Sequence, residues 1–168
     1  GYATGFVLNG AAAIHDFEIA IAGQTSEDVE AVLPDGSFGA AEETGREMNE
    51  ASVEGAGEVG LGEAYSIRLE RIADARFMQA SLLHEAYRAG IPVTVHVAIG
   101  TDTPHTHPAA SGAAIGDAMF EGLKRSNRFS ELHARLEIFN GGGEQRFRAA
   151  HSVSGYQEQS HMPQMLTE

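Results

Sequence analysis

Residues 91–99 read Ile-Pro-Val-Thr-Val-His-Val-Ala-Ile, and this stretch decides the class of fold. β-branched residues stand at nearly every second position, which favours an extended strand. The proline falls at the beginning of the run, where a missing N–H donor is tolerated. A polar loop with two prolines follows at 100–112, and helix-forming residues resume at 113–125. The pattern predicts a strand, a loop and a helix in succession.

The start of the chain repeats this order. The apolar run that ends at Asn9 is too short for an independent helix and has the composition of a buried parallel strand. A helix is expected over residues 11–22, and Gly23 is a natural place for it to stop. Strand–helix units of this kind predict an α/β fold with an open parallel sheet and flanking helices. Further helices are expected over 27–33, 40–51, 62–72 and 77–89, with a mobile glycine-rich loop at 54–62.

The composition excludes several classes of site and partner. The 168 residues carry a formal net charge of −13, and clustered Lys and Arg for neutralising nucleic-acid phosphates are missing. Cysteine is absent, which excludes disulfides, thiolate metal sites and a Cys nucleophile. No apolar stretch approaches the ~20 residues needed to cross a bilayer, and no signal-peptide pattern is present. We therefore expect a cytoplasmic protein that binds neither nucleic acid nor membrane.

Two regions of different character are expected along the chain. Residues 1–137 form a partial domain, and residues 138–168 show no sustained hydrophobic period, which predicts an irregular or disordered tail. The chain opens at Gly1, already close to an apolar run, which indicates a fragment of a longer protein.

Polar residues follow both predicted strands. In open parallel sheets, ligands bind outside the carboxyl ends of the strands. Asn9 and Gly10 lead there into a helix N-terminus that can face a phosphate group, because glycine lets a ligand approach the backbone closely. After the second strand, Asp102 can accept the hydroxyl groups of a ribose. His105 and His107 in the same loop could ligate a metal, carry a proton or simply face solvent.

Two segments resemble the deoxyhypusine synthase family, and in particular its bacterial deoxyhypusine synthase-like branch. One is Leu-Asn-Gly-Ala-Ala-Ala-Ile-His-Asp at 8–16; the other is the strand at 91–99 with Gly-Thr-Asp after it, followed by Gly-Ala-Ala-Ile-Gly-Asp at 112–117. The resemblance covers roughly residues 2–120. It implies an incomplete Rossmann-like fold that binds NAD, transfers the aminobutyl group of spermidine or a related polyamine, and assembles as a homo-oligomer such as a tetramer.

The resemblance also assigns roles by position. Asn9, Gly10 and Ala11 would touch NAD, and Asp102 would meet its adenosine ribose. His15 would stand in the place of an acidic active-site residue, and Asp117 would bind the amine of the substrate. With the other polar residues that follow the two strands, the expected cofactor contacts are Asn9, Gly10, Ala11, Asp16, Thr101 and Asp102, and the expected catalytic residues are His15, His105 and Asp117.

The sequence departs from the family's pattern at the catalytic lysine. Lys124 is the only lysine in the chain, and it stands at the end of a predicted helix. Transfer through an imine needs a lysine amine in the site. Two alternatives stay open for this reason. Asp102, His105 and His107 could support metal-assisted hydrolysis or another proton transfer, or the chain could be an inert module for NAD binding or assembly.

Overall fold

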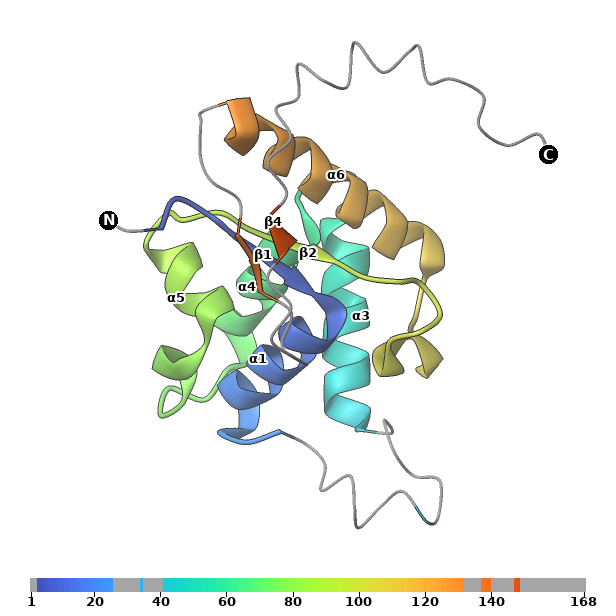
Figure 1. The fold of residues 1–168 in the computed structure, drawn as a ribbon. Coiled ribbons are helices and arrows are strands. Elements are labelled where there is room, and N and C mark those ends of the chain that lie inside the picture. Colours follow the sequence, from blue (N-terminus) through green and yellow to red (C-terminus); the bar gives the residue numbers. More distant parts are fainter. Residues whose placement is uncertain (1–2, 26–33, 35–40, 132–136, 140–146, 149–168) are drawn as a thin grey trace, which may run out of the picture.

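The computed structural model mixes helices with a small parallel sheet (Figure 1). It describes residues 3–25, 34, 41–131, 137–139 and 147–148, with side chains in the last helix described up to Arg125. In this part of the chain, no helix combines the length and the apolar character that crossing a membrane requires.

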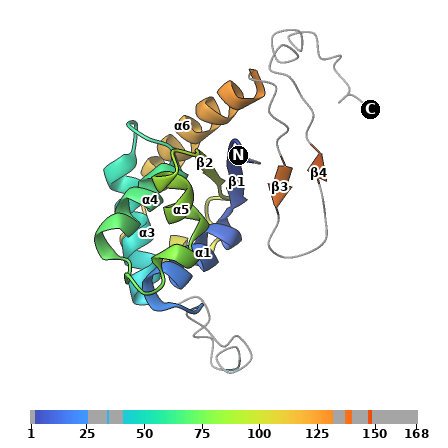
Figure 2. The ribbon, with the colours of Figure 1, turned by 90° about the vertical axis from the view of Figure 1, so that its left-hand side faces the viewer.

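The sheet is built on the two strands expected from the sequence. β1 (Phe6–Asn9) pairs in parallel with β2 (Val93–His96), so that Asn9 lies opposite His96. This pairing confirms a parallel sheet in a mixed helix and strand fold. β1 also pairs in parallel with β3 (Glu137–Phe139), and β3 pairs antiparallel with β4 (Phe147–Arg148), giving the order β2-β1-β3-β4 (Figure 2).

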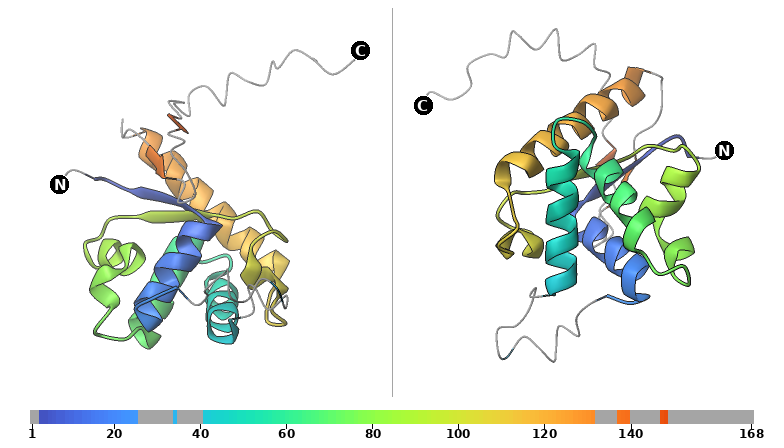
Figure 3. Two further views of the ribbon diagram at one scale, coloured as in Figure 1. Left: turned by 60° about the horizontal axis from the view of Figure 1, so that its bottom comes forward. Right: turned by 180° about the vertical axis from the view of Figure 1, so that it is seen from behind.

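Helices flank the first two strands. Their bounds are α1 (Gly10–Ala22), α3 (Glu42–Gly55), α4 (Leu61–Ile72), α5 (Leu82–Arg88) and α6 (Gly112–Glu131), with short 3-10 turns η2 (Met78–Ala80) and η3 (Thr103–Thr106). Figure 3 shows α1, α4 and α5 together on one side of β1 and β2. α6 packs beside β2 and also contacts α3 and α4.

The hydrophobic core lies between the strands and these helices. Leu8 of β1 and Val95 of β2 point into it and meet Phe17 of α1 and Tyr65 of α4. The two rings pack edge to face with centroids 5.9 Å apart. Burying an apolar side chain of this size contributes about 1.5–3 kcal/mol, so these few residues account for much of the packing between the layers.

α4 approaches β2 at a residue without a side chain. A Cβ atom on Gly62 would lie only 2.3 Å from the carbonyl oxygen of Val93 and 3.3 Å from a methyl group of Val95. Glycine lets the helix backbone reach the strand backbone directly. The distance between α4 and the sheet is therefore set by Gly62.

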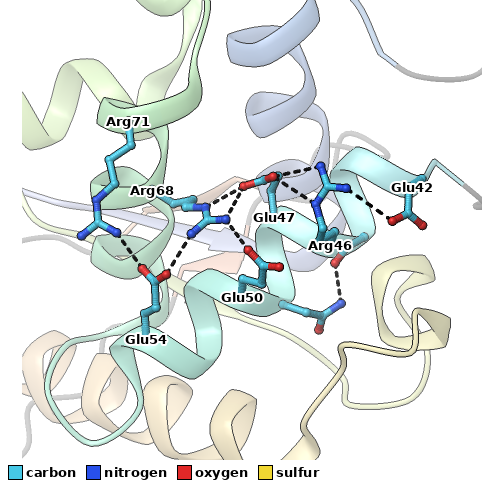
Figure 4. A network of polar contacts seen from close by, with 9 residues as sticks. Glu42, Arg46, Glu47, Glu50, Glu54, Arg68 and Arg71 are labelled. Carbon is cyan, nitrogen blue, oxygen red and sulfur yellow. Dashed lines mark hydrogen bonds and ion pairs between the residues drawn. The ribbon is translucent and has the colours of Figure 1, made fainter.

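An ion-pair network joins α3 to α4 (Figure 4). The side chain of Arg68 is only 13% exposed, and it bonds to Glu47 Oε2 at 2.6 Å and to Glu54 Oε1 at 2.8 Å. It also pairs with Glu50. Burial alone would raise the pKa of Glu47, but hydrogen bonds from Arg68 and Arg46 outweigh burial and lower it. The network therefore holds Glu47 in its charged form between the two helices.

Two sequence predictions of element boundaries are wrong. α3 continues to Gly55 and α4 begins at Leu61, so the predicted loop at 54–62 shrinks to a short connection. The single helix expected over 77–89 divides into η2 and α5, because Ser81 interrupts it and caps α5, its Oγ accepting from the His84 N–H at 3.1 Å. The helix expected over 27–33 lies outside the described residues, as does most of the tail after 139.

Replacing Gly62 by Ala should force α4 away from β2. We expect Gly62→Ala to lower the free energy of unfolding by roughly 1–3 kcal/mol, the usual range for overpacking a core. Gly122→Ala in α6 is the matched control, since its Cβ would meet its nearest neighbour at an ordinary 3.8 Å. Urea unfolding of both variants measures the difference. An equal effect of the two changes would show that Gly62 does not set this distance.

Candidate functional site

The carboxyl ends of β1 and β2 meet at a contact between Gly10 and Asp102. A Cβ atom on Gly10 would lie 2.1 Å from Oδ2 of Asp102, so the carboxylate rests directly on the first residue of α1. Asn9 caps this helix, because its Oδ1 accepts from the Ala12 N–H at 2.9 Å. The space expected for a ligand over Gly10 is thus taken by a side chain of the chain itself.

The Asp102 carboxylate has an unsatisfied oxygen. Its Oδ2 is buried and, among the residues that the structure describes, has no hydrogen-bond partner. A negative group is favoured beside the N-terminus of α1, where the helix dipole is positive. Leaving a buried carboxylate oxygen without a donor is nevertheless costly. A hydroxyl group or a water molecule that donates to Oδ2 would remove this cost.

A small cavity lies beside Asp102. Its volume is about 10 Å³, and its lining includes Gly10, Asn49, Tyr65, Asp102 and His105. A space of this size holds about one water molecule. A nucleotide could therefore reach Asp102 only if the loop that carries η3 moved away from α1.

Two buried residues that the sequence does not identify shape this cavity. Asn49 of α3 donates from Nδ2 to the carbonyl oxygen of Pro104 at 2.7 Å and so fastens η3 to α3. Burial raises the pKa of the Tyr65 phenol to about 12, the charge of Asp102 raises it too, and a hydrogen bond with Ser52 opposes both. Nothing in the spacing of Asn49 or Tyr65 along the chain predicts that they meet Asp102.

The two loop histidines have different surroundings. His105 lines the cavity, and its Nδ1 accepts from the Gly100 N–H at 3.2 Å. His107 turns toward α3, where its Nε2 lies 3.0 Å from Oε2 of Glu42. Its Nδ1 accepts from the Ala109 N–H, which leaves the proton on Nε2 to donate to that carboxylate. The side chains of His105 and His107 therefore have different partners, although the sequence suggests that they could act together.

The described residues offer no metal centre. Across them, no group of three or more His, Asp or Glu side chains is placed to hold a metal ion. His96, at the end of β2, bonds through Nε2 to the Thr94 hydroxyl at 3.1 Å, and burial lowers its pKa. The prediction that Asp102, His105 and His107 act together on a metal thus finds no support in the described part of the chain.

Asp16 has a structural role in place of the expected cofactor contact. Its Oδ1 accepts from the Leu82 N–H at 2.6 Å, and its Oδ2 accepts from the Leu83 N–H at 3.0 Å and from the Ser81 hydroxyl at 2.7 Å. These donors belong to the first turn of α5, which the carboxylate caps. The bonds tie α1 to α5 and leave little capacity for a ligand.

The remaining predicted site residues lie on the surface. Ala11 and His15 are exposed on α1, and Asp117 is exposed on α6. The Thr101 hydroxyl donates to the carbonyl oxygen of Ala98 at 2.8 Å. The structure therefore brings Gly10, Asp102 and His105 together at the strand ends, next to Asn9, and leaves Ala11, His15, Thr101 and Asp117 on the surface.

Two larger cavities lie elsewhere. One of about 560 Å³ stands at the opposite, amino end of β2, beside Ser66, Tyr87, Pro92 and Arg125. Another of about 390 Å³ lies between α1 and α3 beside Glu18 and Thr44, whose hydroxyl donates to Glu18 at 3.1 Å. Both volumes fall in the usual range for small ligands, but neither cavity includes the carboxyl ends of the parallel strands.

Comparisons with protein families, with curated proteins and with solved structures find no match to this chain. The function of the chain must therefore be inferred from its own residues.

Exchanging Gly10 for Ala should displace Asp102. We expect Gly10→Ala to lower the free energy of unfolding by roughly 1–3 kcal/mol, because the methyl group and the carboxylate cannot share one place. In an Asp102→Ala background the same change should cost much less, since alanine also favours the helix. A double-mutant cycle by urea unfolding measures the coupling. Additive effects would mean that the two residues do not touch.

The raised pKa of Tyr65 predicts a loss of stability at high pH. The folded chain holds the phenol proton more tightly than the unfolded chain. The contribution of Tyr65 to the free energy of unfolding is therefore complete below the pKa that the phenol has in the unfolded chain. It disappears as the pH rises from about 10 to about 12 and amounts to about 2–3 kcal/mol. Tyr65→Phe should remove this part of the pH dependence, whereas the exposed Tyr87→Phe should retain it. Unfolding curves at several pH values that show the same slope in both variants would contradict this assignment.

Proposed function

We propose that this chain is a deoxyhypusine synthase-like protein with a Rossmann-like fold that binds NAD where β1 and β2 end. The observation that carries the proposal is the buried Oδ2 of Asp102, which lies over the start of α1 and has no donor among the described residues. In open parallel sheets a carboxylate in this position accepts a ribose hydroxyl. The two quoted sequence motifs supply the likeness to the family.

The residues around Gly10 include groups that can contact the phosphate and the ribose of a dinucleotide. The N–H groups of Gly10 and Ala11, in the first turn of α1, have no acceptor within a regular helix, so they can donate to a phosphate group. Asn9 keeps this turn in place through its bond to the Ala12 N–H, and Ala11 is exposed beside it. Asp102 would meet the ribose after η3 has moved aside. NAD bound there would supply a hydride acceptor.

A polyamine would be the second ligand in this proposal. The net charge of −13 suits a cationic substrate, and Asp117 offers an exposed carboxylate on α6. His15 and His105 are the groups we assign to moving protons. Lys124 is paired with Glu121, so we assign no imine-forming role to it. Family likeness further suggests a homo-oligomer in the cytoplasm, with a tetramer as the expected form.

An inert NAD-binding or assembly module is the second candidate. The observation that favours it is the absence of any lysine other than Lys124 from the chain. The transferase and an inert NAD-binding module share the nucleotide site and differ only in turnover.

Titration calorimetry with NAD tests the shared part of both candidates. We expect saturable binding to the full chain and a weakening of about 10–100-fold in Asp102→Asn, the range for losing a hydrogen bond to a charged group. Asp117→Asn is the control, because that residue is assigned to the amine and not to the nucleotide. Equal affinities in wild type and Asp102→Asn, or no binding at all, would end the proposal.

The same sample with spermidine separates the candidates. NADH formation that depends on spermidine would support the transferase, whereas binding of NAD without turnover would support the inert module.

A further inference from the structure

The segment that carries η3 is fastened to α3 at three positions. Asn49 donates from Nδ2 to the carbonyl oxygen of Pro104 at 2.7 Å, and Glu42 Oε2 lies 3.0 Å from Nε2 of His107. Between them, a Cβ atom on Gly45 would lie 3.0 Å from the Cβ of His107, so the histidine rests on the backbone of the helix. Glu42, Gly45 and Asn49 share one face of α3 because of their spacing. We call these three residues the α3 clamp.

Residues 103–107 form one wall of the small cavity beside Asp102, and we call them the lid. Pro104 and His105 provide this wall, while α1, α3 and α4 line other sides. Pro104 is buried, so the lid is packed against the rest of the fold. At the base of the lid, the His105 N–H donates to the carbonyl oxygen of Asp102 at 3.0 Å. A lid that left α3 would therefore open the cavity and uncover Asp102.

The closed position of the lid combines favourable contacts with an electrostatic cost. Oδ2 of Asp102, beside the cavity, is buried and has no hydrogen-bond donor among the described residues. A buried acceptor without a donor costs about as much as one or two ordinary hydrogen bonds contribute. The contacts of Asn49 and Glu42 with the lid act in the opposite direction. Because these contributions are of similar size, a second position of the lid is accessible in energy.

We propose that the lid opens and closes over the Asp102 site and that the α3 clamp holds it closed. NAD then binds only the open form, because the cavity of about 10 Å³ under the closed lid holds about one water molecule. The affinity measured for NAD is reduced in proportion to the fraction of molecules whose lid is open. Contacts on α3 thereby set the affinity for a ligand at the strand ends.

This inference rests on the proposed function, because the lid controls access to the nucleotide site proposed there. The attachment of the lid to the α3 clamp can nevertheless be measured without any nucleotide. The two parts are therefore tested separately.

Gly45→Ala tests the clamp in the full chain without ligand. The new methyl group should push His107 off α3, whereas alanine favours the helix itself, so the lid should open while α3 stays folded. Amide hydrogen exchange should become about fivefold or more faster at His105, whose N–H is bonded to Asp102 at the base of the lid. Gly122→Ala in α6 is the matched control, since its Cβ would meet its nearest neighbour at 3.8 Å.

A disulfide between positions 45 and 107 tests the effect of the lid on NAD. The chain has no cysteine, so the double variant Gly45→Cys/His107→Cys contains a single pair. The two Cβ atoms would start 3.0 Å apart, and a shift of about 0.5 Å brings them into the usual range for a disulfide. Calorimetry should show NAD binding about tenfold or more weaker in the oxidised double variant than after its reduction. His107→Cys alone should bind NAD equally under both redox conditions.

Two outcomes would overturn the proposal. One is an equal exchange rate at His105 in Gly45→Ala and Gly122→Ala, which would mean that the clamp does not hold the lid. The other is NAD binding of equal strength by the oxidised and the reduced double variant. Absence of NAD binding from wild type and from every variant would instead end the proposed function, and faster exchange in Gly45→Ala would then still support the lid.

Discussion

The parallel pairing of β1 with β2 is the constraint on which the rest of the structure depends. It sets Asn9 opposite His96, so the chain leaves both strands at one edge of the sheet. Gly10 and Asp102 meet there because Gly10 has no side chain and Asp102 comes six residues after His96, the last residue of β2. A strand shifted by one residue would turn its core side chains outward and separate the two groups.

The surrounding helices hold this edge in place through specific contacts. Gly62 lets α4 lie directly on β2, and Asn49 fastens the η3 segment to α3. Arg68 then joins α3 to α4 through several glutamates. Asp102 is thereby held over the start of α1, and the described part of the chain supplies no donor to its Oδ2. A ligand that supplies a hydroxyl there would gain from a carboxylate that is already in position, but it would have to displace η3.

The sequence predicts the parts of this fold that follow from local patterns. Alternating β-branched residues reveal β2, and the apolar run before Asn9 reveals β1, so their pairing could be expected. The split between η2 and α5 could not, because it depends on Asp16, a residue of α1, reaching the first turn of α5. The local sequence around Asp16 does not reveal these bonds, so the prediction that it contacts a cofactor does not anticipate its place beside α5. His105 and His107 are two residues apart, yet one lines the cavity and the other bonds to Glu42, since the direction of each depends on α3. Asn49 and Tyr65 reach the site only through the packing of whole helices, which a single sequence does not record.

The central claim is that Asn9, Gly10 and Asp102 form one ligand site at the strand ends. Amide NMR spectra of the full chain during titration with NAD test it most directly. The signals of Gly10, Thr101 and Asp102 should move together and saturate at the same concentration. Movement confined to Gly60, Tyr87 and Gly90, which line the larger cavity at the other end of β2, would contradict the account.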